Sequence, residues 1–369
     1  MNFITPPRVL NYILLVCGYL LSRISGRVFH FGKPIAVSIE PTNRCNLHCP
    51  ECPSGIKELN RASGIMDPVL FRKVIDQLSP ELAWLNLYFQ GEPYLNPQFF
   101  ELVSYARTKG IYVSSSTNGH YLDKQNAEAT VKSGLNRLII SVDGTDQQTY
   151  ETYRIGGSFT KVVEGINNLA QARKDAGSKY PKIIVQFLVL KSNQHQVGDI
   201  RQLGIEWGAD KVEIKTAQFY DYEQGNALMP AEGKYSRYRM QDAGYRMRDQ
   251  GSGMQDAGYR MRDAGSGMQD AGCGMRDAGY GMRYSIKNSL PNHCFRMWTG
   301  CVVTWDGKVV PCCFDKDATH LLGELNKERF MTIWKGKVYN DIRRKILKER
   351  KTIDICRNCT EGTGLSRWL

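Results

Sequence analysis

The sequence lacks an apolar run long enough to cross a lipid bilayer. The longest run spans residues 9–21 (VLNYILLVCGYLL) and would rise only about 20 Å as an α-helix, against about 30 Å of bilayer hydrocarbon. An export signal is also missing, because Val16 is large where a small residue should precede Cys17, and only Arg8 precedes the run. We therefore expect a cytoplasmic protein in which residues 1–33 form a helix that packs on the fold or lies on the inner membrane surface.

Clusters of basic residues are also absent. The net charge of +12 and the pI of about 9.1 would suit nucleic acid, an anionic membrane face or acidic small molecules. The basic residues are scattered, however, and the densest basic run, residues 343–351 (RRKILKERK), is typical of the solvated face of a helix. This distribution predicts no nucleic-acid partner.

The cysteines do not follow the pattern of a disulfide scaffold. Their number is odd, they form tight clusters, and the chain of 369 residues is long enough for a large core. These features favour metal binding in a reducing compartment. The eleven cysteines are Cys17, Cys45, Cys49, Cys52, Cys273, Cys294, Cys301, Cys312, Cys313, Cys356 and Cys359.

A tandem repeat occupies residues 238–279, with six copies of a heptad such as YRMQDAG. Every copy ends in glycine, and only Met and Ala could fill a helical seam, which argues against a coiled coil. We expect a flexible surface loop at 238–283, within a linker at 221–283, and no role for Cys273.

Apolar, β-branched runs alternate with amphipathic helical patterns between residues 34 and 220. Six βα units in series predict an α/β fold, with a parallel sheet curled into a partial (β/α)6 TIM-type barrel. The predicted strands are residues 35–40, 83–90, 111–117, 137–143, 182–190 and 211–217.

The segment CNLHCPEC places Cys45, Cys49 and Cys52 within eight residues, just after the first predicted strand. A structural zinc site needs four ligands, and this stretch offers no fourth cysteine and only His48, squeezed between two of the thiols. A [4Fe-4S] cluster held by three thiolates would instead leave one iron open to an outside ligand.

This stretch resembles the C-x3-C-x2-C signature of the radical S-adenosylmethionine (radical SAM) enzymes. The resemblance implies a [4Fe-4S] cluster that binds S-adenosylmethionine at its open iron. It also implies that an electron breaks the sulfonium C–S bond, giving a 5'-deoxyadenosyl radical that abstracts hydrogen from a substrate. Many family members carry an aromatic residue just before the third cysteine, where this chain has Glu51.

The resemblance further implies cofactor contacts at the ends of the later strands, where the active sites of βα barrels gather. Gly91 and Glu92 match the Gly-Glu motif that receives the ammonium group of S-adenosylmethionine, although GEP is also a tight turn before a helix. Asn118 could hydrogen-bond the cofactor, or simply form an Asn-Gly turn.

Ser141 and Asp143 end the fourth strand two positions apart, so both side chains project from the same face of the sheet. A polar pair there is costly unless it is used, and similar residues in the family hold the ribose hydroxyls. Arg154 follows and could pair with a carboxylate of cofactor or substrate, or form a surface salt bridge. Gln186 and Lys215, on the next two strands, could line the cavity.

The C-terminal segment, residues 284–369, contains the second group of cysteines. Its sequence CVVTWDGKVVPCC predicts a β-hairpin with Asp306 and Gly307 as a two-residue turn, followed by a helix. This register would place Cys301 opposite Cys312, with their Cβ atoms about 5 Å apart.

This segment resembles the SPASM or Twitch extension of radical SAM enzymes, through its GKVVPC and CRNC sequences. The resemblance implies one auxiliary [4Fe-4S] cluster, and Cys301 or Cys313 could replace one of its ligands. Four cysteines in two pairs are also a zinc pattern. The four expected ligands are Cys294, Cys312, Cys356 and Cys359.

The sequence therefore predicts a cytoplasmic radical SAM enzyme with a core barrel at 34–220 and an auxiliary-cluster domain at 284–369. Relatives with auxiliary clusters modify peptides or oxidise small molecules, and both substrate classes remain open. The expected partners are a reductant such as flavodoxin or ferredoxin and a membrane surface contacted through residues 9–21. The alternative is a non-catalytic iron-sulfur or zinc protein that carries electrons or acts as a scaffold.

Overall fold

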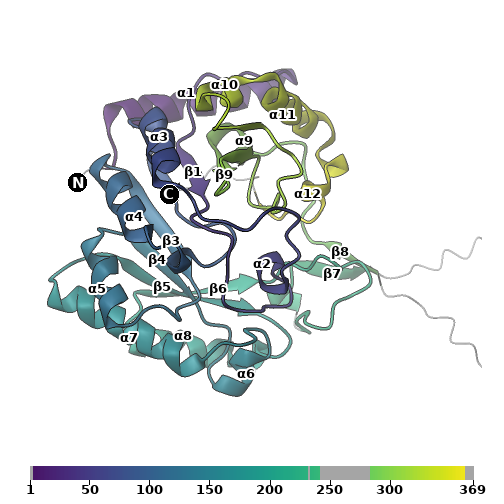
Figure 1. The fold of residues 1–369 in the computed structure, drawn as a ribbon. Helices are drawn as coiled ribbons and strands as arrows, with labels where there is room; N and C mark the ends of the chain where they lie inside the picture. Colours follow the sequence, from purple (N-terminus) through teal and green to yellow (C-terminus); the bar gives the residue numbers. More distant parts are fainter. Residues whose placement is uncertain (1–2, 232, 242–282, 362–369) are drawn as a thin grey trace, which may run out of the picture.

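The computed structural model describes residues 3–231, 233–241 and 283–361. All six predicted strands form, and they lie parallel and in chain order within one sheet, as in a partial barrel (Figure 1). The predicted α/β class is therefore confirmed. The strands are β1 (Ala36–Ile39), β2 (Trp84–Asn86), β3 (Tyr112–Thr117), β4 (Arg137–Ser141), β5 (Lys182–Val189) and β6 (Lys211–Thr216).

The helices between these strands begin at residues that satisfy free backbone N–H groups. The side chains of Asp67, Asp123, Asp146 and Ser158 each accept a hydrogen bond from the first turn of the helix that follows. The helices are α2 (Pro53–Ile56), α3 (Pro68–Leu78), α4 (Phe99–Thr108), α5 (Lys124–Lys132), α6 (Gln147–Glu151), α7 (Phe159–Asp175) and α8 (Val197–Glu206), with 3-10 turns η1 (Pro93–Leu95), η2 (Gln194–Gln196) and η3 (Gly233–Tyr235).

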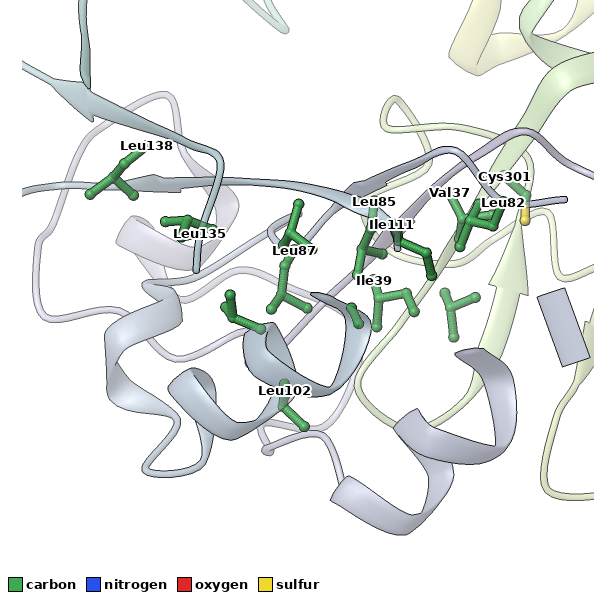
Figure 2. Close-up of a cluster of buried hydrophobic side chains, with 14 of the residues drawn as sticks. Val37, Ile39, Leu82, Leu85, Leu87, Leu102, Ile111, Leu135, Leu138 and Cys301 are labelled. Atoms are coloured by element: carbon green, nitrogen blue, oxygen red, sulfur yellow. The ribbon is translucent and has the colours of Figure 1, made fainter. Parts of the chain in front are cut away.

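The two faces of the sheet differ in polarity. Val37, Leu85 and Leu138 point to the outer face, where they are buried in the main core together with Leu102 of α4 (Figure 2). Because successive side chains of a strand point to opposite faces, their neighbours point inward. The inner face carries polar side chains that line a cavity, among them Ser38, Asn86, Gln186 and Lys215.

The C-terminal segment extends the same sheet. Strand β9 pairs in parallel with β1, and β10 and β11 continue the sheet antiparallel. A buried ion pair lies at this junction, because Arg61 donates to both Glu40 oxygens at 2.6 and 2.5 Å. Glu40 also accepts from the backbone N–H of Trp305 at 3.1 Å. The elements are β9 (Gly300–Val303), β10 (Lys308–Val310), β11 (Gly323–Glu324), α9 (Arg296–Thr299), α10 (Phe330–Lys335), α11 (Lys337–Glu349), η4 (Arg350–Thr352) and α12 (Asp354–Arg357).

The predicted β-hairpin forms, but its predicted two-residue turn is wrong. The N–H of Gly307 bonds the carbonyl of Thr304 at 2.9 Å, and the N–H of Thr304 bonds the carbonyl of Lys308. Gly307 has a φ of +84°, so a type I turn is followed by a left-handed residue, which adds one position to the loop. Val303 therefore faces Val309, and the register that would place Cys301 opposite Cys312 is shifted by one residue.

The N-terminal helix is longer than the apolar run that predicted it. Helix α1 (Pro6–Ser25) has 20 residues, which corresponds to about 30 Å. By length and composition alone it could cross a membrane, so the expectation that it is too short was wrong. One face, which includes Arg8, Asn11 and Tyr19, is buried against the rest of the protein.

The repeat begins inside an ordered element. Strands β7 (Tyr238–Gln241) and β8 (Arg283–Ile286) pair antiparallel, with Gln241 opposite Arg283. The first four repeat residues therefore form a strand instead of the expected loop. Residues 242–282, including Cys273, lie outside the described residues.

Candidate functional site

The first cysteine group lies in the loop that follows β1. The backbone N–H of Cys52 bonds the carbonyl of Cys49 at 3.1 Å, and Cys52 then precedes α2 as its N-cap residue. The ring Nδ1 of His48 lies 3.2 Å from the carbonyl of Gly55, so this histidine holds the loop through one ring nitrogen. All three thiols contact one hydrophobic cluster, in which Cys49 is buried and Cys45 and Cys52 are partly buried.

The electrostatic surroundings of this trio disfavour free thiolates. Burial raises the pKa of Cys45 to about 11, with smaller contributions from Glu92 and the other two thiols. Burial also raises the pKa of Cys49, against the opposing effect of Arg154. The trio therefore combines soft sulfur donors with an environment in which thiolates need a positive partner.

Glu92 is held at the end of β2 by the neighbouring strand. Its Oε2 accepts from the N–H of Asn118 at 2.7 Å, and its Oε1 accepts from the hydroxyl of Thr117 at 2.8 Å. Burial raises the pKa of Glu92 to about 7. Because this carboxylate is 1% exposed and has no cationic hydrogen-bond partner among those contacts, its charged form would be favoured by an ammonium group.

Gly91 allows this turn to lie against the cysteine loop. Its φ is +74°, and a Cβ atom there would lie 2.6 Å from the carbonyl oxygens of Thr42 and Arg44. The N–H of Glu92 also bonds the carbonyl of Arg44 at 2.7 Å. The predicted GEP motif thus packs directly against the chain that leads into Cys45.

Asn118 links the third strand to the first cysteine. Its Nδ2 donates to Oδ1 of Asn46 at 2.8 Å and lies 4.0 Å from Sγ of Cys45. Asn118 also stabilises its own turn, since Oδ1 accepts from the N–H of His120 at 3.1 Å. Both readings of this asparagine, a turn former and a residue at the site, therefore fit its position.

Arg154 connects the fourth strand to the second cysteine. Its Nε donates to Oδ2 of Asp143 at 2.6 Å, and its Nη1 lies 3.7 Å from Sγ of Cys49. Burial lowers the pKa of Arg154, but Asp143 and Cys49 outweigh that effect and raise it. Arg154 is thus not the surface salt bridge that was one expectation.

The two polar residues at the end of the fourth strand are both buried. Asp143 is 1% exposed, and its Oδ1 accepts a hydrogen bond from the N–H of Leu188 at 2.7 Å. Ser141 is buried on β4 opposite Gln186.

Glu51, the residue just before the third cysteine, forms a hydrogen bond with a residue outside the cysteine loop. Its Oε1 accepts a hydrogen bond of 2.8 Å from Nδ2 of Asn226. The side chain therefore ties the cysteine loop to the segment that follows β6.

The second cysteine group surrounds a cavity of about 30 Å³. Three of its four predicted members, Cys294, Cys356 and Cys359, are 7–9% exposed, and burial raises the pKa of Cys359 to about 12. The described residues hold no trio of Cys, His, Asp or Glu side chains close enough to bind a single metal ion; the four thiols instead line the walls of a shared space. All four predicted ligands, Cys294, Cys312, Cys356 and Cys359, are among the residues that line this cavity.

The two remaining cysteines of the C-terminal segment lie elsewhere. Cys301 is packed in the main core beside Val37 and Leu82 (Figure 2). Sγ of Cys313 accepts from Nη1 of Arg296 at 3.1 Å and lines a different cavity. Neither lines the 30 Å³ cavity, so the structure does not favour them as replacements.

Sequence reasoning missed two arginines in the basic run at 343–351. Arg343 and Arg350 are both fully buried, so the expectation that this run is a solvated face was wrong for them. Nη2 of Arg350 lies 3.4 Å from Sγ of Cys359. Tyr339, Arg343 and Ile346 of α11 are buried together, and Arg350 lies seven positions after Arg343. This helical spacing is the sequence signal that could have predicted the burial of Arg343 and Arg350.

A larger cavity of about 350 Å³ lies between the inner face of the sheet and the C-terminal segment. Gln186 and Lys215 line it, as expected from the sequence. Arg237 and Arg296 add two positive charges, and Glu361 adds one negative charge that is paired with Arg296 at 2.7 Å. The cavity is thus polar and has an excess of positive charge.

The two cysteine groups are joined by one small hydrophobic cluster. It contains both Cys49 and Cys359, with Leu47, Phe219 and Leu290 among its members. The structure therefore places one cysteine of each predicted group in the same apolar cluster.

Comparison with known families gives two matches. Residues 39–200 match the Radical SAM superfamily, and residues 294–360 match SPASM, an iron-sulfur cluster-binding domain. The first range contains the cysteine trio with Gly91, Glu92 and Asn118, and the second begins at Cys294 and includes Cys359. A Radical SAM domain implies a [4Fe-4S] cluster and S-adenosylmethionine, and a SPASM domain implies auxiliary iron-sulfur binding.

Among curated proteins, the chain is similar to a PqqA peptide cyclase of Gluconobacter oxydans (strain 621H), with 32% identity over 206 residues, 54% of each protein. It is also 28% identical over 195 residues to the tungsten-containing aldehyde ferredoxin oxidoreductase cofactor-modifying protein of Pyrococcus furiosus, covering 52% of this chain and 54% of that protein. The chain spans about half the length of these relatives.

Solved structures share the fold. SuiB of Streptococcus suis bound to S-adenosylmethionine matches with a TM-score of 0.58 at 15% identity, over 88% of this chain and 71% of that one. BtrN in complex with AdoMet and 2-DOIA matches with a TM-score of 0.51 at 17% identity, over 89% and 93% of the two chains.

Proposed function

We propose that this chain is a radical SAM enzyme that cleaves S-adenosylmethionine and abstracts hydrogen from a substrate, because its residues 39–200 match the Radical SAM superfamily and its residues 294–360 match SPASM. A [4Fe-4S] cluster held by Cys45, Cys49 and Cys52 would supply the electron for this cleavage when bound. The observation that carries the proposal is the contact of the cysteine loop with Glu92, a buried carboxylate that forms no ion pair within the described residues. An electron carrier would have no need of that carboxylate.

The residues at the strand ends would bind and orient the cofactor. Glu92 would receive the ammonium group, since its buried carboxylate is bonded by Thr117 and Asn118 and by no Lys or Arg side chain of the described residues. Gly91 would allow close approach, and Asn118 would donate from Nδ2. Ser141 and Asp143 would contact the ribose hydroxyls.

Arg154 would place a positive charge beside Cys49. Its guanidinium is fixed by Asp143 and lies 3.7 Å from the sulfur of Cys49, so it would stabilise the thiolate. Nη2, the third nitrogen of the guanidinium, would be within reach of a carboxylate of cofactor or substrate.

The second cysteine group would hold one auxiliary [4Fe-4S] cluster through Cys294, Cys312, Cys356 and Cys359. Four thiols around one cavity supply a complete donor set, and the buried charge of Arg350 lies beside them. Cys49 and Cys359 belong to one hydrophobic cluster, so both cofactor sites would adjoin the same apolar region. A cluster held by these thiols would supply an acceptor for the electron that the substrate radical loses after hydrogen abstraction.

The substrate would occupy the 350 Å³ cavity. We favour a peptide, because the relative from Gluconobacter oxydans is named as a peptide cyclase. The relative from Pyrococcus furiosus is named for modifying a cofactor. The positive lining from Lys215, Arg237 and Arg296 would suit a side chain with a carboxylate. The same chemistry would serve a small acidic molecule, and mass spectrometry of the product would separate the two.

The protein would work in the cytoplasm, where thiols stay reduced. A flavodoxin or ferredoxin would supply the electron. Both assignments rest on the redox chemistry of the proposed clusters.

Anaerobic reconstitution with iron and sulfide, followed by dithionite and S-adenosylmethionine, tests the activity. We expect 5'-deoxyadenosine from the intact chain and none from the Cys45→Ala/Cys49→Ala/Cys52→Ala variant. The matched control is Cys301→Ala, which removes a thiol from the core and should still release the nucleoside. Full iron loading of the intact chain without any 5'-deoxyadenosine would instead support the electron-carrier alternative.

A further inference from the structure

Helix α1 has one buried face and one exposed apolar face. Of the 18 large apolar side chains that are exposed in the described residues, eight lie between Ile4 and Ile24. Soluble monomers rarely expose so much contiguous apolar surface unless it binds something. We define the outer face of α1 as Val9, Leu10, Ile13, Leu14, Cys17, Leu20, Leu21 and Ile24, all of them exposed.

The buried face fixes the direction in which the outer face points. The guanidinium of Arg8 donates to the carbonyls of Pro80 at 3.1 Å and Gly110 at 2.8 Å. Asn11 exchanges two hydrogen bonds with the backbone of Lys33, at 2.9 and 2.8 Å. These contacts hold α1 along the surface of the protein with its apolar side outward.

The segment that contains α1 carries charge of one sign. The first acidic residue of the chain is Glu40, so no negative charge occurs in residues 1–39. Arg23 and Arg27 are exposed at the C-terminal end of the helix. Helices α10 and α11 lie along the same edge of the molecule (Figure 1), where Trp334 of α10 donates to the carbonyl of Gly32 at 3.0 Å.

From these observations we infer that the outer face of α1 binds the surface of an anionic phospholipid bilayer, with the helix lying in the plane of the interface. Apolar side chains would enter the boundary between headgroups and acyl chains, and the two arginines would contact anionic headgroups. A transmembrane placement would pull Arg8 and Asn11 away from the partners that hold them. A symmetric contact between two copies would bring basic segments together without acidic partners.

Vesicle sedimentation with the full reconstituted chain tests this inference. Vesicles of phosphatidylcholine with about one-third phosphatidylglycerol should sediment the protein, and phosphatidylcholine alone should bind it more weakly. The Leu10→Gln/Ile13→Gln/Leu21→Gln variant should bind anionic vesicles at least tenfold more weakly, because it removes apolar area that enters the bilayer. The Arg23→Gln/Arg27→Gln variant should lose the preference for the anionic lipid.

The matched control changes exposed apolar residues on other elements. Val69 of α3 and Ile205 of α8 are 71% and 51% exposed, and the Val69→Gln/Ile205→Gln variant should bind vesicles as the unchanged chain does. Equal binding by the α1 triple variant and the unchanged chain would overturn the inference. So would a dimer in light scattering that the triple variant converts to a monomer, with no vesicle binding, because a second copy would then cover α1. Release of 5'-deoxyadenosine should be the same in all these variants, so the outcome is independent of the proposed activity.

Discussion

Nε of Arg154 donates a hydrogen bond of 2.6 Å to Oδ2 of Asp143, and both side chains are largely buried. Breaking a buried ion pair from one side leaves an uncompensated charge. We expect Arg154→Gln to lower the free energy of unfolding by about 3–5 kcal/mol, measured by urea denaturation. The Arg154→Gln/Asp143→Asn double variant should recover part of that loss, since no buried charge then remains alone.

An exposed pair serves as the control for this measurement. Arg72 and Glu101 also form an ion pair, but both side chains are about half exposed. Arg72→Gln should therefore change the free energy of unfolding by less than about 1 kcal/mol. A similar cost at Arg72 and Arg154 would contradict the role of burial.

Glu92 should make the free energy of unfolding depend on pH. In the folded chain its pKa is about 7, raised by burial from an ordinary value of 4.5. The folded chain therefore binds the proton of Glu92 more tightly than the unfolded chain does. The contribution of Glu92 to the free energy of unfolding is complete below pH 4.5 and is lost as the pH rises to about 7. The loss should be on the order of 3 kcal/mol. Glu92→Gln should remove this fall in denaturation curves of the metal-free chain, and an unchanged fall would assign it to another group.

The iron content should separate the two cysteine groups. The Cys45→Ala/Cys49→Ala/Cys52→Ala variant should keep about four irons per chain after reconstitution, held by the second group. Cys312→Ala should lower the iron bound at the second group, whereas Cys313→Ala should not, because Cys313 lies outside the 30 Å³ cavity. Loss of all iron from the triple variant would argue against two separate sites.

The sequence predicted the parts of the molecule that depend on local pattern. Alternating apolar runs predicted all six parallel strands, and the spacing of Cys45, Cys49 and Cys52 led to a loop at the end of β1. The hairpin register could not be predicted in the same way, because one left-handed residue, Gly307, shifts every side chain by one position.

The burial of Arg343 depends on long-range packing, so it could not be predicted from the sequence. The sequence of the basic run 343–351 is typical of a solvated helix face. In the fold, however, Arg343 donates to the carbonyl of Met297 at 3.0 Å. Its guanidinium also lies over the rings of Trp334 and Tyr339. These partners are distant in the chain or one turn away. Only the folded arrangement shows which groups the buried guanidinium contacts.

Arg350 should tune the second cysteine group. A positive charge 3.4 Å from Cys359 favours the more negative, reduced state of a cluster bound there. Arg350→Met should therefore lower the reduction potential of the auxiliary cluster, on the order of tens of millivolts, as measured by redox titration with electron paramagnetic resonance. Arg350→Lys keeps the charge and should shift the potential less, which separates electrostatics from misfolding.

The boundary of the repeat can be tested by two deletions that differ by a few residues. Replacing residues 242–282 with Asn-Gly joins Gln241 to Arg283, which already face each other across β7 and β8, through a turn that suits a hairpin. Stability in urea should be equal or higher, because the loop to be closed is shorter.

Deleting residues 238–279 instead removes β7 and the buried Tyr238, whose hydroxyl bonds Asn358 at 2.9 Å and the N–H of Phe219 at 2.9 Å. Loss of a buried aromatic side chain should cost about 3–5 kcal/mol. The contrast between the two deletions arises because Tyr238 joins the end of the barrel to the segment that carries Cys359. Equal stability of the two variants would show that β7 contributes nothing to that connection.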